Sequence, residues 1–109
     1  MAQPPTVLLC GYGAFGQQHS EAWRQAAPGL RLRVADPREA ARTAAREAGC
    51  APEDITAKAE DLIAGSDIVD IVTTSDDHYR LARAALDAGK PVLIEKPAVK
   101  TLAEAEDLY

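Results

Sequence analysis

Histidine and cysteine are scarce in this 109-residue sequence, and so are long apolar runs. His19 and His78 are its two histidines, Cys10 and Cys50 its two cysteines, and none of them has the spacing of a metal site. We therefore expect no metal, and two buried free thiols that suit a reducing compartment. No apolar run reaches the length that spans a bilayer, and residues 1–5 lack the pattern of a signal peptide, so a cytoplasmic location is expected.

Positive charge is also limited, because 12 Lys and Arg residues stand against 17 Asp and Glu residues for a formal charge of −5. The basic residues are scattered, so neither nucleic acid nor a membrane surface is an expected partner. The composition is 47% hydrophobic and 27% charged, as in ordinary globular domains. The length accommodates one domain, which we take as residues 1–109.

Short apolar runs alternate with helical patterns along the chain. Strands are expected at residues 6–10, 30–35, near 55, 68–73 and 91–95, and helices at 14–27, 36–49, 60–65, 75–89 and from 101 onward. This alternation implies right-handed crossovers between parallel strands. The predicted fold is an α/β doubly wound parallel sheet of five strands in the order 3-2-1-4-5, without a sixth strand.

The sequence also predicts how three of these helices begin or pack. The first is expected to bury Phe15, Ala22, Trp23 and Ala26, and the last to bury Leu102, Ala105 and Leu108. Thr101 and Glu104 have the spacing of a capping box that opens the last helix. The second helix is expected to start at Asp36-Pro37, with proline in the first helical position.

A GxGxxG motif, GYGAFG at residues 11–16, joins the first predicted strand to the first helix. Gly11 permits a tight turn, Gly13 lets a pyrophosphate approach the backbone, and Gly16 lets the helix pack closely. A structural strand-helix turn is the alternative explanation. The motif favours a dinucleotide site because it opens a strand-helix-strand unit, residues 6–36, that ends in an acidic residue.

The start of this first helix is the expected phosphate site. The free N–H groups of Ala14 and Phe15, together with the positive end of the helix dipole, would face the anion. No basic side chain is then needed. Tyr12, inside the motif, is expected to flank the cofactor.

Asp36 lies 20 residues beyond Gly16, at the end of the second predicted strand. A carboxylate in this position accepts hydrogen bonds from both adenosine-ribose hydroxyls and repels a 2′-phosphate, which favours NAD over NADP. An alternative role for Asp36 is to cap the second helix. Arg38 leaves the choice between NAD and NADP open, because an arginine there could hold a 2′-phosphate or lie against the adenine.

Glu95-Lys96-Pro97 follows the fifth predicted strand, at the sheet edge where ligands of open α/β folds bind. A lysine in this position is usually solvated, but one fixed between an acid and a proline could orient a substrate hydroxyl or donate a proton. The predicted site therefore has residues from both ends of the chain.

Three segments in this order, GYGAFGQQH at 11–19, TTSDDHYRLARAALDAGKPV at 73–92 and EKP at 95–97, resemble the Gfo/Idh/MocA oxidoreductases. The resemblance spans essentially the whole chain. It implies an NAD(P)-dependent dehydrogenase of sugars, inositols or related polyols, with Lys96 as the catalytic residue that contacts substrate and nicotinamide. It also implies a cis peptide bond between Lys96 and Pro97.

The same resemblance assigns further cofactor-binding residues. Thr73, Thr74 and Ser75 match the loop that passes the diphosphate and the nicotinamide ribose, and His78 and Glu95 are placed with them. His19 and His78 both match family positions, but each is expected to serve mainly in helix packing.

Members of the family continue into a second α/β half of about two hundred residues, the size of a second domain. That half carries most substrate-binding and catalytic residues, so we expect this chain to bind cofactor but to be inactive alone. The alternative is a non-catalytic nucleotide-binding or assembly module. The fifth strand would be an exposed sheet edge, which predicts self-association through residues 91–95.

Overall fold

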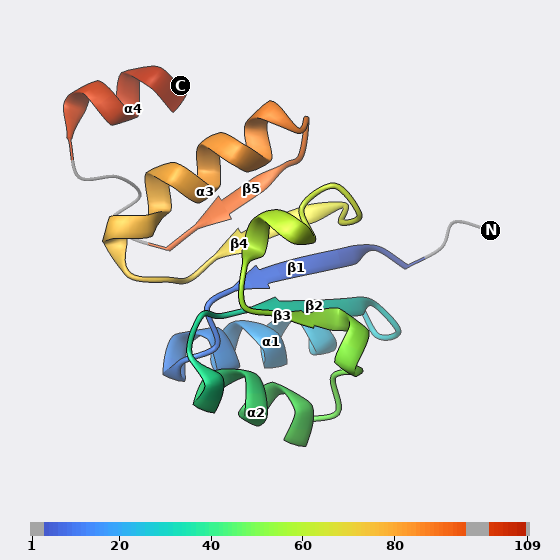
Figure 1. Cartoon of the computed structure of the whole chain (residues 1–109). Helices are drawn as coiled ribbons and strands as arrows, with labels where there is room; N and C mark the ends of the chain where they lie inside the picture. The colour runs from blue at the N-terminus through green and yellow to red at the C-terminus, as the bar shows by residue number, and fades with distance from the viewer. Residues whose placement is uncertain (1–3, 96–100, 109) are drawn as a thin grey trace.

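The computed structural model describes residues 4–95 and 101–108, which form a parallel sheet with helices on both faces (Figure 1). The strands are β1 (Thr6–Cys10), β2 (Arg31–Ala35), β3 (Ile55–Thr56), β4 (Ile68–Ile71) and β5 (Val92–Ile94). The helices are α1 (Ala14–Ala26), α2 (Glu39–Glu47), α3 (Ser75–Asp87) and α4 (Leu102–Leu108), with 3-10 turns at Pro52–Asp54 and Ala59–Asp61. In this part of the chain, no helix has the length and apolar character needed to cross a membrane.

The strand order β3-β2-β1-β4-β5 confirms the predicted five-stranded doubly wound sheet. All neighbouring strands are parallel, and β1 lies at the centre, paired in register with β2 and β4. From β1 the chain builds β2 and β3 on one side and then crosses back to build β4 and β5 on the other, so the direction of winding reverses between β1 and β4. This reversal opens a crevice at the carboxyl ends of the two strands.

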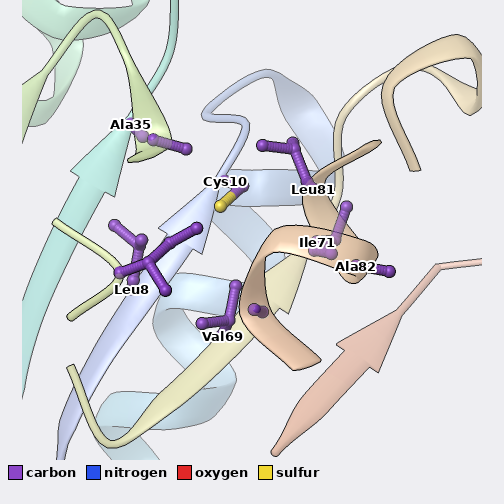
Figure 2. Packing of buried hydrophobic residues seen from close by; sticks show 10 residues of the cluster. Leu8, Cys10, Ala35, Val69, Ile71, Leu81 and Ala82 are labelled. Atoms are coloured by element: carbon purple, nitrogen blue, oxygen red, sulfur yellow. The ribbon is translucent and has the colours of Figure 1, made fainter. Parts of the chain in front are cut away.

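The central strand is apolar at four successive positions because both of its faces are covered. Leu8 and Cys10 point toward α3, where they pack with Val69, Ile71, Leu81 and Ala82 (Figure 2). Val7 and Leu9 point the other way, into a second core formed with α1 and α2. Burial on both faces fixes the strand register, because a shift of one residue would exchange the two sets of side chains.

The predicted buried face of α1 is wrong at three of its four positions. Phe15 is 64% exposed, and the two alanines are exposed as well. The helix instead buries Gly16 and Ser20, with Trp23 half-buried. A Cβ on Gly16 would lie 2.1 Å from the carbonyl oxygen of Gly11, so α1 lies too close to the turn before it for any side chain at this point.

Tyr12 corrects another expectation, because its side chain is buried in the α1–α2 core and does not flank the cleft. The second helix also begins later than predicted: α2 starts at Glu39, with Arg38 as its N-cap. The side chain of Asp36 accepts the backbone N–H of Arg38 at 2.9 Å. That bond holds residues 36–38 in a turn, so Pro37 lies before the helix rather than in its first turn.

The final helix has its predicted capping box: the N–H of Glu104 donates to Oγ1 of Thr101 at 3.1 Å, and the N–H of Thr101 donates to Oε1 of Glu104 at 3.3 Å. Its apolar face differs from the prediction, because Leu102 is 76% exposed and only Leu108 packs against the core. Polar contacts join α4 to α3, among them the hydrogen bond from the Tyr79 hydroxyl to Asp107 at 2.7 Å.

Candidate functional site

A cleft of about 490 Å³ opens at the carboxyl edge of the sheet, where the strand order reverses. The turn after β1, the loop after β2 and the loop after β4 line it. Its lining residues are Gly11, Gly13, Ala14, Phe15, Gly16, Asp36, Pro37, Arg38, Val72, Thr73, Thr74 and Asp77. Nine of them are predicted site residues, which the fold has brought together from three separate loops.

Three lining residues were not predicted: Pro37, Val72 and Asp77. Each had a weak sequence signal. Pro37 follows the predicted ribose residue, Val72 ends an apolar run, and Asp77 lies in the first turn of α3 beside the threonine loop. The fold places them in the cleft because they neighbour residues that the motifs identify.

The three glycines of the first turn have different structural roles. Gly11 adopts a φ of +105°, and a Cβ there would lie 2.8 Å from the carbonyl oxygen of Val72. Only glycine therefore allows β1 to turn this close to the end of β4. Gly16 is required by its contact with Gly11. Gly13 is different, because the nearest atom to a Cβ there would be a guanidinium nitrogen of Arg38 at 3.3 Å, so its backbone faces the cleft.

The start of α1 supplies unpaired donors to this cleft. Gly13 is the N-cap and has no side chain to cap the helix, and the first helical bond runs from the N–H of Gln17 to the carbonyl of Gly13 at 2.9 Å. The N–H groups of Ala14 and Phe15 therefore precede the hydrogen-bonded part of the helix. No acidic residue lies in this first turn. The geometry and the helix dipole together favour a bound anion such as a diphosphate.

Asp36 lies at the far side of the cleft and is only 2% exposed. Its Oδ1 accepts the backbone N–H of Arg38 at 2.9 Å and Nε of Arg38 at 3.0 Å, and its Oδ2 accepts the N–H of Tyr12 and Nη2 of Arg38, both at 2.9 Å. Burial alone would raise the pKa of Asp36, but the hydrogen bonds from Arg38 and Tyr12 bring it below its ordinary value. The carboxylate is therefore anionic at neutral pH.

The loop after β4 forms the opposite wall. Thr74 is the N-cap of α3, and Ser75 is its first residue. His78 is 2% exposed, lies behind this wall and donates Nε2–H to the carbonyl of Thr73 at 3.0 Å. His78 is thus placed to fix the threonine loop and is not itself among the residues that line the cleft.

A second polar cluster lies behind the glycine turn, where His19 joins α1, β4 and the end of β5. Nδ1 of His19 is 2.8 Å from Oδ2 of Asp70, and Nε2 is 2.9 Å from Oε2 of Glu95. Trp23 donates its indole N–H to the same oxygen of Asp70 at 2.8 Å. Burial would lower the pKa of His19, but the two carboxylates raise it above its ordinary value. The side chain of Glu95 therefore lies in this cluster and does not line the cleft.

Asp70 is fully buried, and its Oδ1 has no hydrogen-bond partner among the described residues. Sequence reasoning did not single out this residue. The sequence feature that could have identified it is an acidic residue in the middle of an apolar strand, IVDI. A carboxylate buried in such a strand is rare without partners, so Asp70 could have been expected to have hydrogen-bond partners. His19 was expected to pack α1 against the rest of the fold, and it does so through its hydrogen bonds to Asp70 and Glu95.

Lys96, the predicted catalytic residue, lies outside the described residues, as does the expected cis bond to Pro97. Glu95 precedes it, and the N–H of Glu95 donates to the carbonyl of Ile71 at 3.0 Å, which continues the β4–β5 pairing to this point. Over residues 4–95 and 101–108, no group of three or more acidic, histidine or cysteine side chains is placed to hold a metal. Cys10 and Cys50 are both free and buried, as predicted.

Comparisons with known proteins agree with this geometry. Residues 6–109 match the sequence model of a family described as an oxidoreductase family with an NAD-binding Rossmann fold. Levoglucosan dehydrogenase of Pseudarthrobacter phenanthrenivorans is 36% identical over an alignment of 115 positions, gaps included, which covers 94% of this chain and 29% of that protein. Inositol 2-dehydrogenase 1 of Saccharopolyspora erythraea is 36% identical over an alignment of 104 positions, gaps included, which covers 90% of this chain and 30% of that protein.

The fold is also found in solved structures. A crystal structure of an oxidoreductase from Agrobacterium radiobacter, in complex with NAD+, L-tartaric acid and magnesium, matches with a TM-score of 0.85 at 26% identity. The match covers 97% of this chain and 31% of that one. The chain thus spans less than a third of the length of each of these three proteins.

Proposed function

The chain belongs to the Gfo/Idh/MocA oxidoreductases, whose NAD-binding Rossmann domain it matches over residues 6–109, and we propose that the cleft binds NAD as the hydride carrier of a dehydrogenase. The observation that carries the proposal is the start of α1. There the backbone of Gly13 faces the cleft and the first N–H groups of the helix have no capping side chain. A nicotinamide cofactor bound there would accept or donate a hydride.

The residues of the cleft fit the parts of a dinucleotide. The N–H groups of Ala14 and Phe15 would hold the diphosphate, and the carboxylate of Asp36 would accept the ribose hydroxyls. Thr73 and Thr74 form the facing wall, along which the diphosphate and the nicotinamide ribose would pass. Asp36 favours NAD over NADP, because an anionic carboxylate repels a 2′-phosphate.

For the substrate we propose a sugar, an inositol or a related polyol. Levoglucosan dehydrogenase and inositol 2-dehydrogenase 1 are each 36% identical to this chain, which supports this class. Lys96 would orient the reacting hydroxyl and hold or release its proton. The 109 residues alone should bind cofactor without turnover, because hydride transfer needs the substrate held against the nicotinamide and these relatives are about three times as long.

Two further expectations belong to this proposal. β5 pairs with β4 on one side, and no described strand pairs with its other side, so we propose that residues 91–95 mediate self-association. The two free thiols support a reducing compartment such as the cytoplasm.

Isothermal titration of the 109-residue chain with NAD+ and NADH tests the proposed function. We expect saturable binding at ligand concentrations up to about 1 mM, the upper range of cofactor and substrate affinities. The variant Gly13→Ala should keep its fold, because its Cβ meets only the tip of a flexible arginine, but bind at least about tenfold more weakly through loss of the close backbone approach. A folded wild-type chain that gives no binding would defeat the proposal.

A further inference from the structure

One imidazole joins the helix that begins at the cofactor turn to two strands of the sheet. Nδ1 of His19 lies 2.8 Å from Oδ2 of Asp70 on β4, and Nε2 lies 2.9 Å from Oε2 of Glu95, which follows β5. An ionised carboxylate only accepts hydrogen bonds, so the ring makes both contacts when each of its nitrogens carries a proton. The arrangement therefore favours the imidazolium form of His19.

The buried carboxylate of Asp70 adds to this preference. Its side chain is 1% exposed, and its Oδ1 has no hydrogen-bond partner within residues 4–95 and 101–108. Trp23, one turn further along α1, donates its indole N–H to Oδ2 of Asp70 at 2.8 Å but carries no charge. Among these partners, His19 is the group that can supply positive charge to a buried anion. Burial would lower the pKa of His19, but Asp70 and Glu95 together raise it.

His19 also lies close to the end of α1 where we place the diphosphate. It is five residues after Ala14, about 7.5 Å along the helix axis at 1.5 Å per residue. Side chains on a helix lean toward its N-terminus, which brings the imidazole nearer still. In the free chain the positive end of the helix dipole disfavours a cation there. A bound diphosphate would bring negative charge to the same place and favour the imidazolium.

We propose that His19 is a positioning residue for the cofactor: its imidazolium holds the start of α1 against β4 and β5, and NAD binding takes up a proton there. Binding and protonation then favour each other, because a coupling between two binding events is reciprocal. This inference rests on the proposed cofactor site. Two phosphate charges about 10 Å away, in a mostly aqueous dielectric, should raise the pKa of His19 in the complex by about half a unit to one unit.

Calorimetric titration of the 109-residue chain with NAD+ at low salt, from about pH 6 to about pH 9.5, measures this coupling. Pairs of buffers with different ionisation enthalpies report the protons taken up. We expect about 0.3–0.5 proton per NAD+ at the midpoint, little at pH 6, and an affinity that weakens about three- to tenfold as pH rises. ADP-ribose has the diphosphate without the nicotinamide, so it should take up at least as large a fraction.

Two variants separate ionisation from packing. His19→Gln cannot ionise, so the uptake seen in the wild type should disappear, and its affinity should stay near the value that the wild type has at high pH. Glu95→Gln keeps the imidazole but removes one carboxylate that raises its pKa, so the uptake should move to lower pH by about one unit. A histidine that served only in packing would change the affinity by the same factor at every pH.

His78→Gln is the matched control, because His19 and His78 are the two histidines of the sequence. His78 lies behind the opposite wall of the cleft, where it donates to the carbonyl of Thr73 at 3.0 Å. Its loss should weaken NAD+ binding but leave the proton uptake at the wild-type level. Circular dichroism and a thermal melt confirm that each variant is folded, and Glu95→Gln supplies the comparison if His19→Gln is not.

The outcomes separate this inference from the proposed function. A folded wild-type chain that binds no NAD+ would remove the cofactor site, and the inference with it. If the wild type binds NAD+ with no proton uptake and an affinity independent of pH, the cofactor site stands and the inference is wrong. It is also wrong if His19→Gln takes up as many protons as the wild type, or if Glu95→Gln leaves the pH range of the uptake unchanged.

Discussion

Nε2 of His19 lies 2.9 Å from Oε2 of Glu95, so the helix that begins at the cofactor turn is tied to the end of β5. The indole N–H of Trp23 donates to Oδ2 of Asp70, which makes this oxygen an acceptor and Nδ1 of His19 a donor to it. Nε2 therefore donates to Glu95 only while the imidazole is protonated. Loss of that proton removes the contact.

We expect His19→Gln to change how stability depends on pH. The folded pKa of His19 is raised by the two carboxylates, so its stabilising contribution is full below the ordinary value of 6.5 and is lost as pH rises through the folded pKa. The difference in unfolding free energy between wild type and variant should shrink by about 1 kcal/mol between about pH 6 and pH 9. Urea denaturation measures it. A difference that stays constant across this range contradicts the prediction, and Glu95→Gln should reproduce part of the effect.

Gly16→Ala should destabilise the fold severely, because its Cβ would lie 2.1 Å from the carbonyl oxygen of Gly11. We expect a loss of about 3 kcal/mol or more in urea denaturation, or no folded protein at all. The control is Gly89→Ala, where φ is +75° and no atom lies within 4 Å of the added Cβ. That variant should lose about 1 kcal/mol from backbone strain alone. Equal losses in the two variants would show that α1 can move away from the turn.

Both cysteines should resist thiol reagents in the native protein. Burial, with a smaller contribution from the Asp70 carboxylate, raises the pKa of Cys10 to about 12, and burial also raises the pKa of Cys50. The reactive thiolate is therefore scarce at neutral pH. With a chromogenic disulfide reagent at about pH 8, we expect neither thiol to react in buffer and both to react in denaturant. A rapid reaction of the native chain would contradict this.

Leu93→Lys tests the proposed self-association through β5. Leu93 is 51% exposed on the strand that ends the described sheet, and a lysine on an edge strand opposes pairing with another chain. Sedimentation velocity should show concentration-dependent association of the wild type and its loss in the variant. Leu86→Lys, which removes a leucine that is 44% exposed on α3, should leave association unchanged. A monomeric wild type at high concentration would contradict the proposal.

The sheet and the cofactor cleft could be predicted because their signals are local in the sequence. β1 is apolar at successive positions since both faces are buried, and the GxGxxG spacing places Gly11 and Gly16 where only glycine fits. Asp36 follows β2 directly. Parallel strands with short connections leave few alternatives in topology, so the strand order followed from these elements.

The face of α1 could not be predicted in the same way. Phe15 looked like a core residue because it is large and apolar, but the helix packs through Gly16 and Ser20. The buried face is decided by how closely α1 approaches the turn before it, and helical periodicity contains no information on that distance. The cluster around Asp70 was missed for a related reason, because its partners His19 and Glu95 come from distant segments that only the folded sheet brings together.

The central position of β1 has a consequence for synthesis of the chain. β1 leaves the ribosome before the other strands of this sheet, but one of its two neighbours is β4, which is made only after two further strands and two helices. Until residues 68–71 exist, the nascent chain carries a half-paired apolar strand that is open to aggregation or to binding by a chaperone. A chain ending at Gly65 should scatter light at concentrations where the 109-residue chain stays clear, and a clear, folded monomer would contradict this. The growing chain, more than the finished domain, is then the form that needs protection in the cell.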